Sequence, residues 1–273
     1  MVETDLPDHP PLTISFRKGD TPAPACMELA DFMYGNFMTP TSPGRKFGRY
    51  QDGCSIIVIP GSYEGYLNGP AGYATRRKLR RAEREGYAFQ EIDPAAWTDD
   101  IYAVNTSLDT RQGRPMDASY RSRPTNDHDP ALGCPRHREV WFGVVKDGHV
   151  VAYTHVYQVG EMCLYSRILG HGDHMESGIM YQLVAGVIEA LTESAGLRYA
   201  MYERHTSGTP GLQFFKERMG FRPYWVDWQL ADEPVVSTRP AFRAAALGMV
   251  QSRGVARRLV VRLRRAIRSR LPS

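Results

Sequence analysis

The sequence of 273 residues has few cysteines and no long apolar run, and both absences narrow what it can be. Its four cysteines, Cys26, Cys54, Cys134 and Cys163, stand far apart, without the close pairs of zinc-ribbon or redox motifs. Isolated cysteines are typical of a protein in a reducing cytoplasm. The longest apolar stretches are much shorter than the ~20 residues of a membrane-spanning helix. The acidic N-terminus has no apolar segment of signal-peptide type, so we expect a cytoplasmic protein without a transmembrane segment.

Acidic residues and lysine are absent from the end of the chain. Residues 239–273 contain ten arginines and therefore carry a charge of +10, whereas the whole chain carries +4 and the first 238 residues carry −6. Composition thus predicts three parts. These are an N-terminal extension packed on the core (residues 1–70), an enzyme-like core (71–232) and an arginine-rich helical tail (233–273).

Periodicity and turn residues predict a mixed α/β core. The extension is irregular, with a helix near residues 25–34 and a strand near residues 54–60. The core begins with a basic helix at 73–85, a strand at 87–92 and a helix that starts after Asp93-Pro94. A long polar loop at 109–137 precedes the strands 139–146, 149–159 and 162–169, the helix 177–194, the strand 197–203, the helix 211–219 and the strand 221–230. Asp147-Gly148 and Gly160-Glu161 join the three central strands as hairpins, which implies a mixed, mostly antiparallel sheet flanked by helices.

Two motifs carry a family resemblance. Residues 212–221 (LQFFKERMGF) resemble the ending of the GNAT superfamily, where a helix runs into a corner of leucine, glycine and phenylalanine. Lys216 stands where the common GNAT form has a tyrosine that serves as general acid, and this Phe-Lys pair is similar to the FemABX branch. Residues 77–86 (RKLRRAEREG) resemble the basic helix before the first core strand of that branch. Over residues 63–230 the chain therefore resembles the GNAT superfamily, and within it the FemABX-like and single-domain acetyltransferase branch.

The resemblance implies a GNAT-like α/β fold and an acyltransferase. The expected reaction moves an acyl group from acyl-CoA to an amine of a small molecule or peptide, and no metal is expected. An alternative reaction is the FemABX-like formation of an amide bond with aminoacyl-tRNA as donor. A third hypothesis is a non-catalytic binding protein on the same scaffold.

The cofactor loop of the family has no strict counterpart here. Acyl-CoA-using GNAT proteins hold the pyrophosphate on the backbone amides of a Q/R-x-x-G-x-G/A loop at a helix N-terminus. Residues 167–172 (RILGHG) match the letters, but they begin inside a predicted strand and end about five residues before the predicted helix. The better counterpart is Ser177, Gly178 and Ile179, which we expect to bind the cofactor together with Lys216. Because this sequence departs from the strict loop of acyl-CoA-using proteins, aminoacyl-tRNA stays an alternative donor.

Acyl transfer needs the donor carbonyl held, the amine deprotonated and the leaving group protonated. Alternation in the strand 149–159 predicts one face with Val151, Tyr153, His155 and Tyr157. The imidazole of His155 suits a general base and Tyr153 lies beside it, although the same face can simply pack under a helix.

Further candidates follow the strand 197–203, where Glu203 or His205 is an alternative base. His171 and His174 lie close in sequence, but no third ligand has convincing spacing, so we expect no metal there.

Substrate recognition is predicted for a loop and a helix. Arg111, Gln112 and Arg114 of the polar loop can hold a carboxylate or phosphate of the acceptor, with Tyr157 nearby. Arg80 of the basic helix can bind a phosphate. The alternative for each is a solvated surface.

The tail has an apolar stripe and an opposite face of arginines between residues 255 and 271. Such a helix can bind tRNA, an acidic carrier protein or an anionic membrane surface. It can also pack against the acidic body of the protein.

Overall fold

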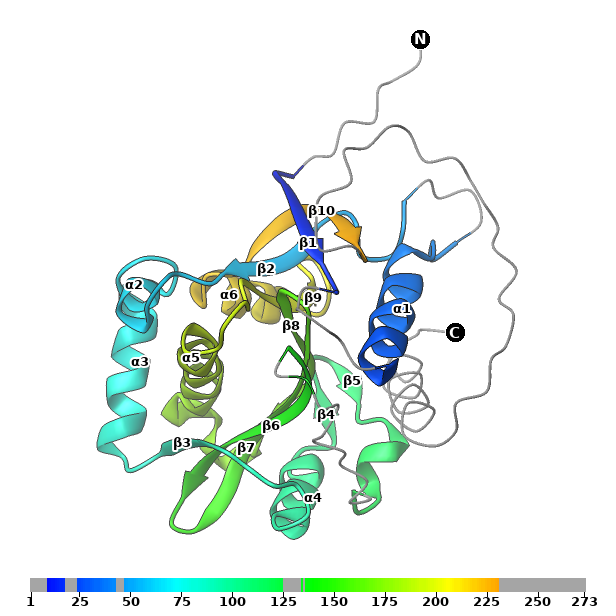
Figure 1. Ribbon diagram of the computed structural model, residues 1–273. Helices are drawn as coiled ribbons and strands as arrows, with labels where there is room; N and C mark the ends of the chain where they lie inside the picture. The colour runs from blue at the N-terminus through cyan, green and yellow to red at the C-terminus, as the bar shows by residue number, and fades with distance from the viewer. Residues whose placement is uncertain (1–8, 18–23, 43–46, 125–133, 135, 231–273) are drawn as a thin grey trace, which may run out of the picture.

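Eight strands join into one mixed sheet in the computed structural model of the protein, which describes residues 9–17, 24–42, 47–124, 134 and 136–230. The order across the sheet is β1-β10-β2-β9-β8-β7-β6-β3, and two further strands form a separate hairpin (Figure 1). The strands are β1 (Pro11–Ser15), β2 (Cys54–Val58), β3 (Ala88–Glu91), β4 (Thr110–Arg111), β5 (Arg114–Pro115), β6 (His137–Lys146), β7 (His149–Val159), β8 (Met162–Gly170), β9 (Tyr199–Arg204) and β10 (Arg222–Gln229). The helices are α1 (Pro24–Met38), α2 (Tyr63–Asn68), α3 (Gly72–Arg84), α4 (Thr98–Thr106), α5 (Ile179–Thr192) and α6 (Pro210–Arg218), with 3₁₀ turns η1 (Ala118–Arg121) and η2 (Gly172–Ser177).

Most neighbouring strands are antiparallel. The exceptions are β8 with β9 and β1 with β10, which run parallel. The predicted mixed, mostly antiparallel sheet flanked by helices is therefore confirmed.

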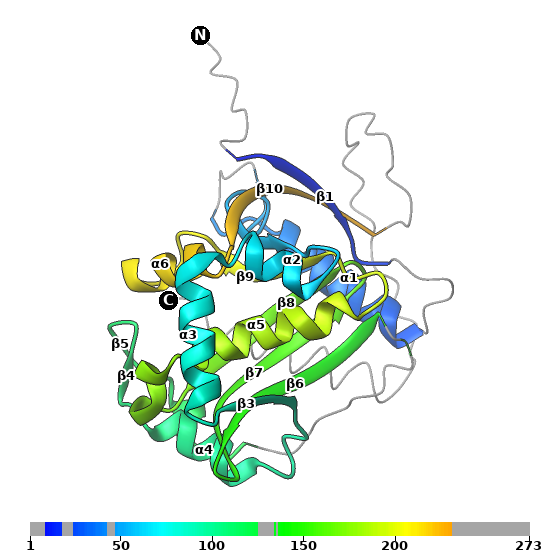
Figure 2. The ribbon, with the colours of Figure 1, turned by 90° about the vertical axis from the view of Figure 1, so that its left-hand side faces the viewer.

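The two faces of the sheet carry different helices. Along β9, Ala200 and Tyr202 point into an apolar cluster with α2, α3 and α5, whereas Tyr199 and Met201 point into a second cluster with α1. A third cluster packs α4 against β7 and β8 on the α1 side. Figure 2 shows α3 and α5 in front of the strands and α1 behind them. We call these the α5 face and the α4 face.

The two predicted hairpins are present. Asp147 and Gly148 have φ of 51° and 83°, the left-handed pair that a tight turn between β6 and β7 requires. Gly160 has φ of 61° in the turn between β7 and β8, and a Cβ there would lie 2.2 Å from the Ser15 carbonyl oxygen. Only glycine fits this second turn, because β1 packs directly on it.

Two local predictions were wrong. The helix expected after Asp93-Pro94 starts only at Thr98, because the Asp93 carboxylate accepts the backbone N–H of Ala95 (3.0 Å) and forms a turn instead of a helix cap. The predicted loop from residue 109 is not irregular throughout. It contains the β4–β5 hairpin and η1.

The N-terminal extension contributes strands to the main sheet. β2 lies between β9 and β10, and β1 covers the outer edge of β10. We expected one strand and one helix before residue 71, but the described residues of that region form two strands and two helices. The extension thus completes the sheet as well as packing on it.

Among the described helices, none combines the length and apolar character needed to cross a bilayer. The predicted arginine-rich helix (residues 255–271) lies outside the described residues.

Candidate functional site

The parallel strands β8 and β9 pair over only three residues each. Their pairing begins at Met162 with Tyr199 and stops at Leu164 with Met201. Beyond this point β8 continues to Gly170 and β9 to Arg204 without pairing with each other. Backbone donors and acceptors that a parallel ladder would use are therefore directed between the two strands at this position.

Both strands are irregular where they part. The register of β8 against β7 shifts between Tyr165 and Arg167, so Ser166 is an extra residue. The register of β9 against β2 shifts next to Glu203, which has φ of 52°. Bulges are frequent beside active sites, and a non-glycine residue in the left-handed region costs of order 1 kcal/mol. Two irregular strands at one level of the sheet mark this position as the candidate site.

A row of side chains crosses the α4 face just beyond the parting. Trp141 of β6 pairs with His155 of β7, which pairs with Arg167 of β8. His155 Nε2 lies 2.7 Å from Glu139 Oε1, with 7% and 3% of the two side chains exposed. The Trp141 ring stacks on the imidazole, with centroids 4.5 Å apart and planes 11° apart. This buried imidazole–carboxylate pair has the arrangement of a general base oriented by an acid.

Tyr153 supports this row from the next position along β7. It is fully buried, and its hydroxyl donates to Asn105 Oδ1 of α4 at 2.5 Å. Burial raises its pKa, so the phenol stays protonated at neutral pH. Arg167 interacts with the Tyr153 hydroxyl and stands over the Tyr120 ring, 5.0 Å from its centroid. The expected face with Tyr153, His155 and Tyr157 is therefore present.

Val151 is a correction to that face. The register of β7 against β6 shifts between Ala152 and Val150, which makes Val151 a bulge residue. Val151 packs in the apolar cluster of the α5 face, and Val150 packs beside Tyr153 instead. The prediction from strict alternation was wrong for Val151. The extra residue in β7 moves the side chains that precede the bulge to the opposite face of the sheet.

Glu203 and His205 lie at the end of β9 and directly after it. Glu203 is on β9, two residues beyond the last pair with β8. His205 follows β9 and faces β2 and α6, with Nδ1 3.3 Å from Ser55 Oγ and Nε2 3.5 Å from Glu217 Oε1. Burial lowers the pKa of His205. A role of either residue as base stays a prediction.

Lys216 is fully buried on α6. Its Nζ donates to the Arg204 carbonyl (2.8 Å) and to Ser207 Oγ (2.9 Å), and lies 4.7 Å from the Tyr202 ring centroid. The ammonium group thus fastens α6 to the end of β9. Donor binding by Lys216 stays a prediction.

The start of α5 packs tightly on the basic helix α3. Gly178 has φ of 87°, and a Cβ there would lie 2.9 Å from the Lys78 carbonyl oxygen. Ile179 is fully buried. The Ser177 hydroxyl bonds to the Glu85 carboxylate and, after the stronger effect of Arg81, helps to lower its pKa. Three of the four residues predicted to bind the cofactor therefore lie together at the start of α5, with the Glu85 carboxylate beside them.

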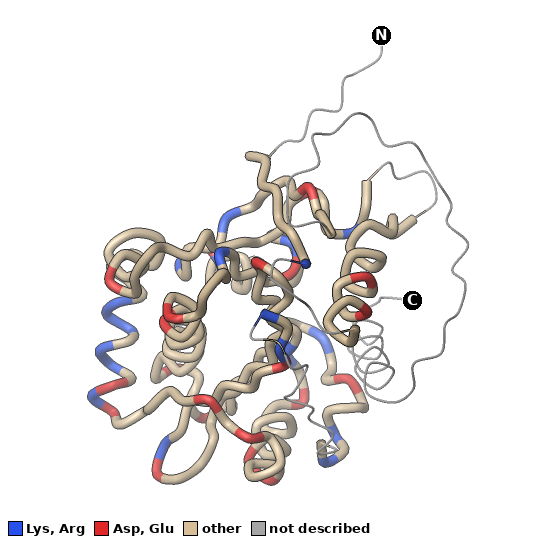
Figure 3. Tube along the Cα trace, in the orientation of Figure 1, with Lys and Arg blue, Asp and Glu red and all other residues tan. Residues whose placement is uncertain are grey.

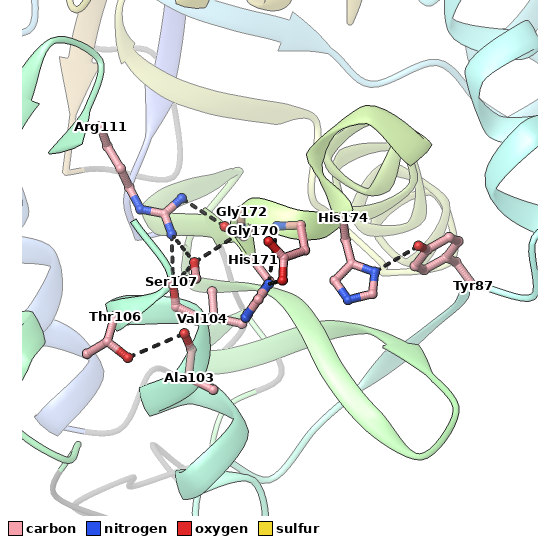
Figure 4. Close-up of polar contacts among 11 residues, drawn as sticks. Tyr87, Ala103, Val104, Thr106, Ser107, Arg111, Gly170, His171, Gly172 and His174 are labelled. Atoms are coloured by element: carbon pink, nitrogen blue, oxygen red, sulfur yellow. Dashed lines mark hydrogen bonds and ion pairs between the residues drawn. The ribbon is translucent and has the colours of Figure 1, made fainter. Parts of the chain in front are cut away.

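The glycines of the literal loop match are held by other contacts, drawn in Figure 4. The guanidinium of Arg111 donates to the carbonyl oxygens of Gly170 (2.8 Å) and Val104 (2.8 Å) and to Ser107 Oγ (3.1 Å). Ser107 Oγ also accepts the N–H of Gly172 (3.0 Å). Arg111 thus connects the end of α4 to the end of β8, and burial lowers its pKa.

The other predicted substrate residues come from separate elements and differ in exposure. Gln112 has φ of 53° in the β4–β5 turn, and its side-chain oxygen lies near Gly208, while Arg114 is exposed. Tyr157 is buried between His155 and the α1 cluster. Arg80 is exposed on α3, the helix that carries a dense run of basic residues in Figure 3. Substrate binding by these four residues stays a prediction.

His171 and His174 lie with ring centroids 5.5 Å apart. His174 Nδ1 is 2.8 Å from the Tyr87 hydroxyl, and His171 accepts the N–H of Asp173 at 3.3 Å. Burial and the neighbouring His171 lower the pKa of His174. Both rings serve local contacts around η2.

Sequence reasoning missed Glu139 and Arg167. Both are charged residues of central strands whose side chains lie on the α4 face. A charge at an inward position of an apolar strand was the available signal, because such groups are buried only when they are paired.

No protein-family model matches the sequence, and no curated protein matches it. Among solved structures, FemX is similar at 12% identity, with a TM-score of 0.52 over 72% of this chain and 66% of FemX. The chain has the FemX fold. The expected α/β fold, of the type seen in FemX, is thereby confirmed.

Two other solved structures are similar over smaller shares of the chain. The C-terminal domain (DUF2156) of a protein named as a lysylphosphatidylglycerol synthetase from Agrobacterium fabrum is 13% identical, with a TM-score of 0.41 over 63% of this chain and 58% of that domain. A GCN5-related N-acetyltransferase from Kribbella flavida is also 13% identical, with a TM-score of 0.36 over 63% of this chain and 54% of that protein. The chain spans less than two thirds of the length of each of these structures, FemX included.

Proposed function

We propose that this chain is an N-acyltransferase that transfers an acyl group from acyl-CoA to an amine of a small molecule or peptide. The parting of β8 and β9 beyond Leu164 and Met201 carries the proposal. There the strands stop pairing with each other, and their backbone N–H groups can hold the carbonyl oxygen of a thioester. Ser177, Gly178, Ile179 and Lys216 are the proposed contacts to the rest of the donor.

His155 is the proposed base. The Glu139 carboxylate lies 2.7 Å from Nε2 of this ring, and the imidazole takes the proton of the amine, directly or through one water molecule. The amine nitrogen then attacks the thioester carbon, the carbon–sulfur bond breaks, and the thiolate leaves and takes up a proton. The Glu139 carboxylate stabilises the imidazolium that forms. Glu203 of β9 is the proposed contact to the ammonium form of the acceptor.

Replacing the base tests this assignment. His155→Asn and Glu139→Gln are expected to lower turnover about 10²–10⁴-fold, while donor binding stays within a few fold of wild type. The measurement is product formation by mass spectrometry with a panel of amines. His149→Asn is the matched control, because His149 lies on the same strand but is exposed. Full turnover by His155→Asn would remove His155 from the mechanism.

The donor is tested by thermal unfolding with acetyl-CoA, longer acyl-CoA and free CoA. A ligand at about 100 times its dissociation constant adds about 2.7 kcal/mol of stability, which raises the melting temperature by a few degrees. A rise with acyl-CoA supports the proposed donor. No rise with any of the three contradicts it.

A second candidate function is amide-bond formation from aminoacyl-tRNA. Two observations favour it: Arg77, Arg80 and Arg84 are exposed on α3, and α5 begins against the Lys78 carbonyl without a glycine-rich loop. Salt-sensitive binding of tRNA, with no response to CoA, would select this reaction. A chain that binds neither donor would be a non-catalytic binding protein, the third hypothesis. The arginine-rich tail is a proposed contact to tRNA, an acidic carrier protein or an anionic membrane.

A further inference from the structure

Three potential metal ligands meet where the N-terminal extension joins the sheet. Cys26 lies in the first turn of α1, and Cys134 and His137 lie at the entrance to β6, joined by an isolated β-bridge. The two sulfurs and one imidazole nitrogen all lie within 4.8 Å of one another. Cys26 and His137 are fully buried, and Cys134 is half-buried. Residues more than 100 positions apart in sequence therefore form one cluster.

The imidazole of His137 has a defined orientation. Its Nε2 lies 2.7 Å from the carbonyl oxygen of Phe16. A carbonyl only accepts hydrogen bonds, so Nε2 carries a proton and donates it. The lone pair of Nδ1 then faces the sulfur of Cys134, 3.3 Å away. Metal-binding histidines commonly have this arrangement, because a backbone carbonyl that accepts one ring N–H fixes the tautomer that leaves the other nitrogen for the metal.

The distances between the ligand atoms suit tetrahedral coordination of one ion. Zinc bonds of about 2.3 Å to sulfur and about 2.0 Å to nitrogen put two ligand atoms roughly 3.6–3.8 Å apart. The 3.3 Å between Cys134 and His137 is within a few tenths of an ångström of that value, and the widest separation in the cluster needs to close by at most about 1 Å.

The donor set also selects the ion. Thiolate and imidazole ligands favour Zn²⁺ over Mg²⁺ or Ca²⁺, which take oxygen ligands. Two thiolates and one Zn²⁺ give a neutral site, and a buried charge is tolerated when it coordinates a metal.

We propose that Cys26, Cys134 and His137 bind a Zn²⁺ ion. A solvent molecule completes the tetrahedron, as in other sites with three protein ligands. The ion joins α1 to the start of β6 and, through the Phe16 carbonyl, to the end of β1. It stabilises the attachment of the extension to the sheet, because metal binding is coupled to folding. The proposal is independent of the acyltransferase reaction.

Elemental analysis of the full chain, purified without a histidine tag, tests the site. We expect one zinc per chain in the wild type and almost none in Cys134→Ser or His137→Ala. Cys163→Ala is the matched control, because Cys163 is a buried thiol on β8 outside the cluster, and this variant is expected to keep its zinc. Removal of zinc by a chelator should lower the melting temperature of the wild type, and added zinc should restore it, whereas Cys134→Ser should not respond.

Cobalt substitution of the wild type tests the site by absorption spectroscopy and does not require that any variant folds. Co²⁺ bound by two thiolates produces a thiolate-to-cobalt charge-transfer band and intense visible bands of tetrahedral geometry. Two results would overturn the proposal. An intact mass 2 Da below the reduced value would identify a Cys26–Cys134 disulfide. The second result is a protein that contains no zinc and gives no cobalt spectrum, while the thiols of Cys26 and Cys134 both react with a thiol reagent. The cluster would then be only a thiol–imidazole hydrogen bond.

Discussion

Buried ionisable side chains of this protein connect separate elements in pairs. Glu139 and His155 join β6 to β7, and Lys216 joins α6 to the end of β9. His205 joins the end of β9 to β2 and α6 through Ser55 and Glu217. Each group contacts residues of other elements, so its replacement disturbs the packing between those elements.

His205 makes the stability of the fold depend on pH. Burial lowers its pKa below the ordinary value of about 6.5, so the unfolded chain binds a proton more readily than the folded one. Its contribution is complete above that ordinary value and is lost as the pH falls through the folded pKa. The difference in unfolding free energy between wild type and His205→Gln should therefore shrink between about pH 7.5 and about pH 5.5.

Urea unfolding at both pH values measures this difference. A His205→Gln difference that grows on acidification would mean that the contact with Glu217 outweighs burial and raises the pKa.

At the scale of elements, the approach of α3 to α5 depends on one glycine. Gly178 has a φ of 87°, and the Lys78 carbonyl oxygen lies close to it. A side chain at this position would therefore be strained by the backbone conformation and would also contact that oxygen too closely. We expect Gly178→Ala to destabilise the protein by about 1–3 kcal/mol, measured by urea unfolding.

Gly35→Ala provides the contrast. Gly35 lies inside α1, and a Cβ added to it would meet no atom within 4 Å, so alanine should stabilise the helix by about 0.5–1 kcal/mol. If Gly178→Ala instead matched the wild type in stability, α3 would be able to move away, and the start of α5 would be open to a bound pyrophosphate.

At the scale of the whole molecule, local signals predicted the core of the fold. Asp147-Gly148 and Gly160 set the three-stranded meander, and helical periodicity located α3, α5 and α6. The pairing of β1 and β2 was not predictable in this way, because their partners β9 and β10 lie near the other end of the described chain. Periodicity reports which face is buried and carries no information about distant partners.

The candidate site was predictable only in part. The alternating pattern of β7 identified Tyr153 and His155, because it is local to one strand. The parting of β8 and β9 and the bulges at Val151 and Ser166 depend on register between strands. Glu139 was missed because its partner comes from a neighbouring strand, and the metal cluster because its ligands come from distant segments.

The sheet order also sets the sequence of events during synthesis. Pro11 of β1 pairs with Trp225 of β10, so the first strand has to wait for more than 200 further residues. At roughly 5–20 residues per second on the ribosome, that delay is roughly 10–40 s. Ile14, Phe16 and the apolar side of α1 lack their partners Val226 and Trp228 in the nascent chain for that time. A holding chaperone that shields this segment should therefore raise the yield of native protein more than one that acts after release.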